Sequence, residues 1–300
     1  MSTQPSTPEP KADQTALIAG LSAYLIWGVS PLYFQILNFV DAFEIIIHRI
    51  LWSAPFLLGV LALSGKLGEL RPVLRDRRSM LTLLATSVLI SINWWGFVWA
   101  VNNGQVLQAS LGYYINPLMS VAVGVIVLRE PLGPWRIAAI ALASLGVLNQ
   151  IISVGEVPWI SLLLAVSFTA YGYLRKVILV DGRIGLFLET AFLFPIALIL
   201  MIWLGQTGQV LQASGIGEFA LLATAGAVTI VPLLFYIIGA RGLRLTTMGI
   251  MQFMAPTLQF AIGIWGGETF TTAHMVTFGL IWAGVATFTY SQLRRRHSQS

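Results

Sequence analysis

Residues 93 to 117, NWWGFVWAVNNGQVLQASLGYYINP, gather amides, hydroxyls and aromatic rings between strongly apolar runs. Because lipid offers no hydrogen bonds, a polar side chain at mid-membrane depth must bond within the protein or line a wet cavity. Positions i, i+3, i+4 and i+7 share one face of a helix, and here they hold Ser110, Tyr113, Tyr114 and Pro117. This spacing predicts one wall of a solute pathway. A helix–helix contact made through the same hydroxyls is the open alternative.

A later apolar run repeats this theme around a second proline. Pro117 has no N–H to donate to the Tyr113 carbonyl. In the same way, Pro256 leaves the Gln252 carbonyl free and shares a helix face with Gln259. We therefore expect two interrupted helices that face each other across a binding site, with Pro117 and Pro256 as points of bending. The residues expected to bind a small-molecule solute are Asn93, Trp94, Ser110, Tyr113, Tyr114, Asn116, Gln252 and Gln259.

Arg49 and Glu189 are the clearest ionisable residues inside apolar runs, and we assign them to coupling or gating. Each lies about five residues, or about 7 Å, into its run. If the two halves of the chain are inverted, roughly 15 Å separates the charges, which is too far for a direct ion pair. One interpretation is that each charge pairs locally or reaches the nearest interface. The other makes Arg49 a guide for an anionic group and Glu189 a proton-binding group for proton coupling.

No motif indicates catalysis, a metal site or a cofactor. The sequence has no acid pair at D-x-x-D spacing, no glycine-rich phosphate loop and no G-x-S-x-G, and its 3 histidines fall at different depths. Cysteine is absent, which excludes disulfides and thiol chemistry. We therefore expect neither an enzyme nor a cofactor. The alternatives are a passive channel and a membrane-embedded transferase that uses Glu130 or Glu268, although both acids lie at the ends of apolar runs, where caps and local ion pairs are expected.

The elements that must position these residues are long apolar helices. The chain of 300 residues is 57% hydrophobic and only 10% charged, whereas a soluble domain is about 25% charged. A hydrocarbon core of about 30 Å takes about 20 helical residues to cross. The composition predicts an all-α polytopic membrane protein with ten transmembrane helices, at about 17–38, 44–64, 80–102, 106–129, 133–153, 157–178, 184–204, 216–240, 243–266 and 272–293.

The positions of the basic residues predict the orientation of these helices. With the N-terminus in the cytoplasm and ten alternating spans, 16 of the 17 Lys and Arg residues fall in cytoplasmic segments, and the remaining one is Arg49. This positive-inside pattern predicts that both termini are cytoplasmic. The run Arg294–Arg296 after the last span is expected to contact membrane lipid and no nucleic acid.

The two halves of the chain repeat one another. Pro55 and Pro195 are 140 residues apart, and Pro117 and Pro256 are 139 apart. Five spans is an odd number, so the second half would enter the membrane upside down relative to the first, as in the inverted repeats of secondary transporters. We expect a disordered cytoplasmic tail at 1–15, a first five-helix repeat at 16–154, a second at 155–293 and a basic cytoplasmic tail at 294–300.

A set of short motifs points to a family. The motifs are His48-Arg49 with Trp52-Ser53, Asn93-Trp94, Trp99 to Asn102, Ala109 to Tyr113, Ile115 to Pro117 and Arg129-Glu130. Over nearly the whole chain this order resembles RarD-type permeases, in the EamA group of the drug/metabolite transporter superfamily. Pro131 departs from the pattern, because the family usually has Arg after the Glu.

The resemblance implies two five-helix EamA repeats in a bacterial inner membrane, with both termini in the cytoplasm. It also implies a permease that carries a small metabolite or drug-like solute outward by alternating access. The identity of the solute, the coupling ion and the oligomeric state stay open.

Overall fold

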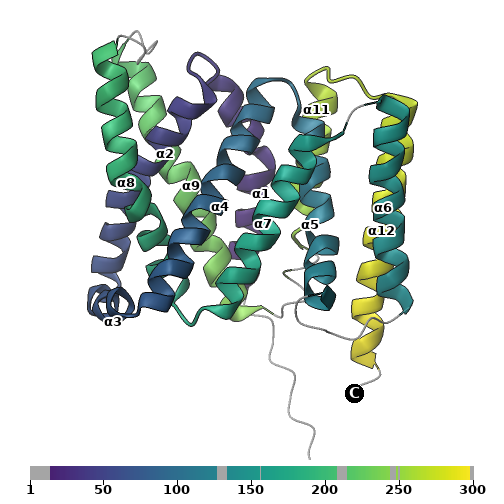
Figure 1. Cartoon of the computed structure of the whole chain (residues 1–300), viewed down its shortest axis with the longest axis horizontal. Helices are drawn as coiled ribbons and strands as arrows, with labels where there is room; N and C mark the ends of the chain where they lie inside the picture. Colours follow the sequence, from purple (N-terminus) through teal and green to yellow (C-terminus); the bar gives the residue numbers. More distant parts are fainter. Residues whose placement is uncertain are drawn as a thin grey trace, which may run out of the picture.

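The computed structural model describes residues 14–126, 134–155, 157–207, 215–243, 248 and 251–297. Within these ranges the regular structure is helical and contains no strand. The long helices lie side by side and run back and forth between two ends of a bundle (Figure 1). Arg129, Glu130 and Pro131, named above for the transferase alternative or the family resemblance, lie outside the described residues.

The long helices of the first half are α1 (Gln14–Ile36), α2 (Ala42–Leu63), α4 (Arg77–Asn102), α5 (Val106–Ile126) and α6 (Pro134–Val154). Those of the second half are α7 (Trp159–Val177), α8 (Gly182–Thr207), α9 (Ile216–Gly242), α11 (Met254–Trp265) and α12 (Thr272–His297). In the part of the chain that the structure describes, 6 helices are long and apolar enough to cross a membrane: α1, α2, α4, α8, α9 and α12. The all-helical membrane class is therefore confirmed.

Two segments differ from the sequence-based expectation. Residues 67–75, expected as a loop, form a short 3-10 helix η1 (Leu67–Glu69) followed by α3 (Leu70–Arg75). In the expected span at 243–266, the described residues Met248 and Met251 are helical, a turn follows at Gln252 and Phe253, and α11 begins at Met254. Pro256 consequently lies in the first turn of α11, where a missing N–H leaves no intrahelical bond unmade.

The packing of the helices follows a regular scheme. α1 packs against α9 and α11, α7 packs against α4 and α5, and α2 packs against α8 and α9. α6 and α12 form a pair at one edge of the bundle (Figure 1). Glycines permit this close approach, because a Cβ at Gly146 would lie 3.0 Å from the Thr277 carbonyl oxygen, and one at Gly284 would lie 2.9 Å from that of Ala139.

The largest buried apolar cluster joins residues from α1, α2, α4, α5, α7, α8 and α9. Large apolar side chains elsewhere lie on the outside of the bundle, for example Leu63 at 93% and Ile199 at 66% exposed. A soluble monomer rarely exposes so much apolar surface, whereas lipid covers it at no cost. The polar residues inside the bundle therefore stand out as the candidate functional groups.

Candidate functional site

Arg49 is a buried cation on α2, and only 6% of it is exposed. Its guanidinium carbon lies 4.7 Å from the centroid of the Trp94 ring and 5.1 Å from that of Phe34. Its Nε donates to the Thr229 hydroxyl at 2.9 Å. Aromatic rings that cover a desolvated guanidinium stabilise its charge by about 2 kcal/mol. We call Arg49, Phe34, Trp94 and Thr229 the arginine cage.

The arginine cage leaves part of the cation unsatisfied. Among the residues that the structure describes, the Nη1 of Arg49 has no hydrogen-bond partner, and no acidic residue pairs with the guanidinium. The hydroxyls of Tyr33 and Tyr113 lie within electrostatic range of it. Removing a cation from water costs several kcal/mol, which rings and one hydroxyl offset only in part.

Glu189 forms a second buried polar cluster, on α8, and is 1% exposed. Its Oε1 accepts a hydrogen bond from the Thr86 hydroxyl at 2.6 Å, and its Oε2 accepts one from the Tyr171 hydroxyl at 3.3 Å. The Nε of Arg175 lies 3.6 Å from Oε1. Glu189 therefore pairs locally with Arg175, as the first of the two interpretations of this residue expects.

Arg175 lies in the last turn of α7, within the span expected at 157–178. Its Nη2 donates to the Gly182 carbonyl at 3.3 Å, so it joins the end of α7 to the start of α8. The guanidinium crosses Gly185 so closely that a Cβ at this position would collide with it. Gly185 therefore makes room for the Arg175–Glu189 contact.

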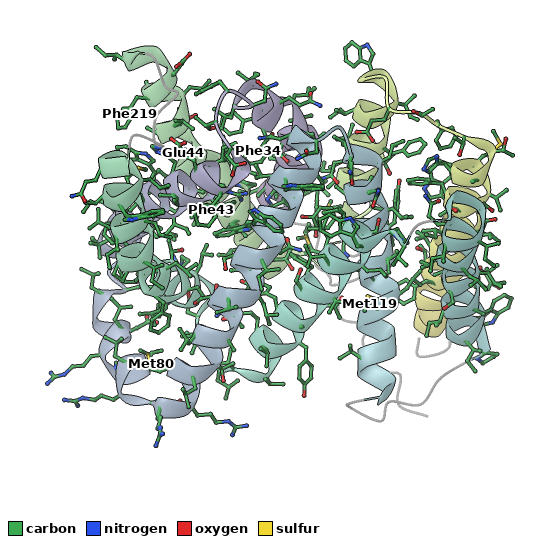
Figure 2. The ribbon with its side chains drawn as sticks, turned by 45° about the horizontal axis from the view of Figure 1, so that its top comes forward. Phe34, Phe43, Glu44, Met80, Met119 and Phe219 are labelled. Atoms are coloured by element: carbon green, nitrogen blue, oxygen red, sulfur yellow. The ribbon has the colours of Figure 1, made fainter. Side chains whose placement is uncertain are left out.

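A continuous series of aromatic rings connects the two charges, which do not contact each other. Successive ring centroids lie 5.9, 5.7, 6.2 and 6.1 Å apart along the series Phe34, Phe97, Tyr113, Phe168 and Tyr171. Phe34 contacts Arg49 at one end, and Tyr171 contacts Glu189 at the other. The rings come from α1, α4, α5 and α7, and we call them the aromatic column. Phe34 lies toward the end of the bundle where α1 passes into α2, and Met80 lies at the opposite end (Figure 2).

Asn93 fixes the middle of the aromatic column. Its Nδ2 donates to the Leu164 carbonyl at 3.1 Å and to the Ser167 hydroxyl at 3.0 Å, and its Oδ1 accepts from the Tyr113 hydroxyl at 3.3 Å. One amide thereby joins α4, α5 and α7. Both sides of the amide are satisfied, so Asn93 orients Tyr113 within the column.

The predicted stripe on α5 divides between two neighbouring helices. Tyr113 faces Asn93 on α4. Ser110 donates to the Pro256 carbonyl at 2.8 Å, and the Tyr114 hydroxyl lies 2.7 Å from that of Thr257, both on α11. The reason is geometric, since consecutive residues of a helix point about 100° apart. The hydroxyls of Ser110 and Tyr114 therefore make the helix–helix contact that was the alternative to a pathway wall.

Gln259 on α11 reaches across to α1. Its Nε2 donates to the Trp27 carbonyl at 3.2 Å, which also accepts from the Ser30 hydroxyl at 2.7 Å. That carbonyl is available because Pro31, four residues later, has no N–H. Gln259 and Asn116 are both buried and keep a side-chain oxygen without a partner among the described residues. Gln252 is half-buried in the turn before α11.

Glu268 caps the N-terminal end of α5. Its two carboxylate oxygens accept hydrogen bonds from the backbone N–H groups of Val106 and Leu107, the first residues of α5. Burial raises the pKa of Glu268, and these hydrogen bonds oppose that rise. The carboxylate caps a helix of the other half of the chain, as expected for an acid at the end of an apolar run.

Sequence reasoning missed four of the groups that hold the two charges: Thr229, Thr86, Tyr171 and Arg175. The signal that could have identified the first three is a polar residue within an apolar run. Their pairing with Arg49 and Glu189 depends on helix rotation, which periodicity does not specify.

The family of the chain follows from comparison with known proteins. The model of the EamA-like transporter family matches residues 14–150. A transporter of Vibrio cholerae is 39% identical over 294 residues, which is 97% of both chains. Protein RarD of Streptomyces exfoliatus is 42% identical and covers 94% of this chain and 90% of its own length.

Protein RarD of Escherichia coli is 38% identical, over 93% of this chain and 95% of its own. A solved crystal structure with 19% identity shares the fold, with a TM-score of 0.58 over 91% of this chain and 96% of that one. The buried charges, the aromatic column and the apolar helices are thus features of a membrane transporter, and the chain belongs to the RarD-type permeases of the EamA-like transporter family.

Proposed function

We propose that this protein is a secondary transporter that carries a small solute across a bacterial inner membrane by alternating access. The observation that carries the proposal is the aromatic column, with the buried charges Arg49 at one end and Glu189 at the other. Of its five rings only Phe168, at 38%, is classed as exposed. Buried charges within membrane helices mark solute or ion pathways. Aromatic rings suit a solute that is only modestly polar.

The proposed architecture has ten spans in two inverted repeats, at 16–154 and 155–293. Equivalent packing in the two halves supports it: α1 contacts α9 and α11, while α7 contacts α4 and α5. The α6–α12 pair supports it as well. Gly146 approaches Thr277 and Gly284 approaches Ala139, and both the two glycines and the two carbonyl residues are 138 positions apart. A two-fold relation between the halves would produce this reciprocal contact.

The proposed orientation places the α3 end of the bundle in the cytoplasm, together with both termini. Exposed arginines gather near that end, at positions 71, 75, 77 and 78, and side chains tipped with nitrogen project near Met80 (Figure 2). Basic residues favour the cytoplasmic side of a membrane. The opposite end, where α1 passes into α2, then faces the periplasm.

Glu189 is proposed to couple transport to protons. In the charged form its carboxylate holds the Arg175 guanidinium, the Thr86 hydroxyl and the Tyr171 hydroxyl. A proton on Glu189 would remove the attraction to Arg175 and loosen the joint between α7 and α8. Such a change of local charge can bias a helix pair between two arrangements.

The solute is proposed to contact polar side chains of the arginine cage, of the aromatic column and of the contact between α5 and α11. The side-chain oxygens of Asn116 and Gln259 have no donor among the described residues, and Trp94 belongs to the arginine cage. The other proposed contacts are Asn93, Ser110, Tyr113, Tyr114 and Gln252, with Pro117 and Pro256 as the points of bending.

The experiment that tests this function compares the solutes accumulated by cells that lack the protein with those of cells that overproduce it. A solute that changes is then loaded into proteoliposomes, and its exchange is measured against concentration. Saturable exchange supports a carrier. Flux that rises without saturation supports the passive channel and contradicts alternating access.

A further inference from the structure

A polar pocket lies at the end of the bundle beyond the arginine cage. It has a volume of about 230 Å³ and is lined by Asn38, Phe39, Val40, Asp41, Ala42, Asn102 and Asn103. These residues lie in the connection between α1 and α2, at the start of α2 and at the end of α4. The same three helices supply Phe34, Arg49 and Trp94 to the cage. The pocket therefore lies on the helices of the cage, about 12 Å along α2 from Arg49 at 1.5 Å per residue.

One apolar layer separates the pocket from the cage. It consists of Leu37, Ile45 and Val98, each of which is 0% exposed. Each residue of the layer lies three or four positions, or one helical turn, from a member of the cage. All three belong to the same buried cluster as Phe34 and Trp94. A single turn of side chains thus closes the cage toward this end of the bundle.

The Nη1 group of Arg49, which has no partner among the described residues, indicates which kind of ligand could bind there. The rings of Phe34 and Trp94 cover the guanidinium, and Thr229 occupies Nε. The donors of a guanidinium lie in its plane, so a ligand at Nη1 must approach the edge of that plane. A carboxylate suits this approach, because it accepts charge-assisted hydrogen bonds from one guanidinium. A doubly charged phosphate would need more donors than a single arginine among apolar rings supplies.

We infer that Arg49 binds the carboxylate of the transported solute, whose apolar body lies against the aromatic column. This inference rests on the proposed transport function and adds the class of substrate, namely a monocarboxylate with a flat apolar part. The bound carboxylate supplies the negative charge that no described residue gives to Arg49. The layer of Leu37, Ile45 and Val98 then has to part for the solute to exchange with the pocket.

The test compares solute profiles of cells that carry an empty vector, the wild type, Arg49→Gln or Arg49→Lys. Arg78→Gln is the matched control, because it removes an exposed arginine from the far end of the bundle. We expect the solutes that respond to the wild type to carry a carboxylate. Proteoliposomes should transport such a solute at least about tenfold faster than its neutral primary amide, and Arg49→Gln should lose this preference.

Arg49→Lys keeps the charge without the planar donors, so its preference for carboxylate over amide should fall by about tenfold. This variant also carries the test if Arg49→Gln does not accumulate in the membrane. Two results would overturn the inference. One is that the solutes that respond to the wild type are neutral or cationic. The other is that the Arg49 variants prefer carboxylate over amide as strongly as the wild type does. An absence of any difference between wild type and empty vector contradicts the proposed transport function itself, and the inference with it.

Discussion

Buried polar residues in this protein form hydrogen bonds with neighbouring helices, because lipid offers none. Asn93 satisfies its whole amide with groups from α5 and α7, and Glu189 holds three partners from α4 and α7. Arg49 differs, because it contacts two rings and one threonine, and its Nη1 has no partner in the described part of the chain. A fully bonded polar group is suited to positioning, whereas an incompletely bonded one is suited to binding.

The role of Asn93 in positioning Tyr113 can be tested with Asn93→Ala and Tyr113→Phe. Both changes release the contact at 3.3 Å between the two side chains, so transport should fall. Abundance in the membrane should stay near normal, since each hydrogen bond between membrane helices contributes about 0.6 kcal/mol. Tyr113→Phe removes one such bond, and Asn93→Ala removes three. Ser91→Ala is the control, because Ser91 bonds only within its own helix. Normal transport with reduced abundance would make these residues packing contacts.

Proton coupling through Glu189 predicts that Glu189→Gln loses the dependence of transport on a pH gradient but keeps solute exchange. The matched variant is Gly185→Ala, whose Cβ displaces Arg175 while leaving the carboxylate in place. It should also weaken the dependence on the gradient, because the proposed coupling acts through the contact between Arg175 and Glu189. Both rates are measured in proteoliposomes with and without an imposed pH difference. Gradient-driven transport by Glu189→Gln at the wild-type rate refutes this coupling.

At the scale of elements, membrane thickness makes helix positions predictable. The spans expected at 44–64 and 272–293 correspond to α2 (Ala42–Leu63) and α12 (Thr272–His297). The helix α3 was not predicted, because a short helix outside the apolar runs leaves no hydropathy signal. Polar positions inside spans were likewise predictable, but their partners were not. Thr229 is 180 residues from Arg49, and Thr86 is 103 from Glu189.

The two prolines lie at different places in their helices, and replacing either should slow transport. Pro117 lies within the continuous helix α5, whereas Pro256 lies in the first turn of α11. Alanine at position 117 restores a donor to the Tyr113 carbonyl, and alanine at 256 would let α11 extend back toward Gln252. Both variants should exchange solute more slowly, because a stiffer helix tilts less. Wild-type exchange rates in both would mean that these positions do not bend during transport.

At the scale of the whole molecule, an ion pair joins the two halves at the α3 end. The Nζ of Lys66 lies 3.1 Å from Oδ2 of Asp181, and the backbone N–H of Arg183 donates to Oδ1 at 2.9 Å. Partial burial acts to raise the pKa of Asp181, but the Arg183 and Lys66 contacts outweigh it and lower the pKa to about 2. The ionised carboxylate is therefore favoured in the folded protein.

A carboxyl whose pKa is lowered by folding stabilises the protein above its unfolded pKa of about 3.9. That stabilisation is lost as pH falls through the folded pKa of about 2. Asp181→Asn should lower the stability of the purified protein at pH 7 by about 1 kcal/mol, after allowance for solvent screening. The difference from wild type, followed by thermal unfolding, should narrow steadily below pH 4. A constant difference across this range contradicts an electrostatic origin.

The orientation of the molecule predicts which ends of the helices face each compartment. Arg78 lies in the first turn of α4 and Lys176 in the last turn of α7, so both should lie with Arg296 on the cytoplasmic side. Gln105 lies between α4 and α5, at the other end of α4, and should be periplasmic together with Glu156. Fusions to alkaline phosphatase, active only outside the cytoplasm, and to a fluorescent protein, active only inside, distinguish the two sides at each position. A cytoplasmic signal at Gln105 would contradict ten spans, because the next basic segments would then have to cross the membrane against the positive-inside rule.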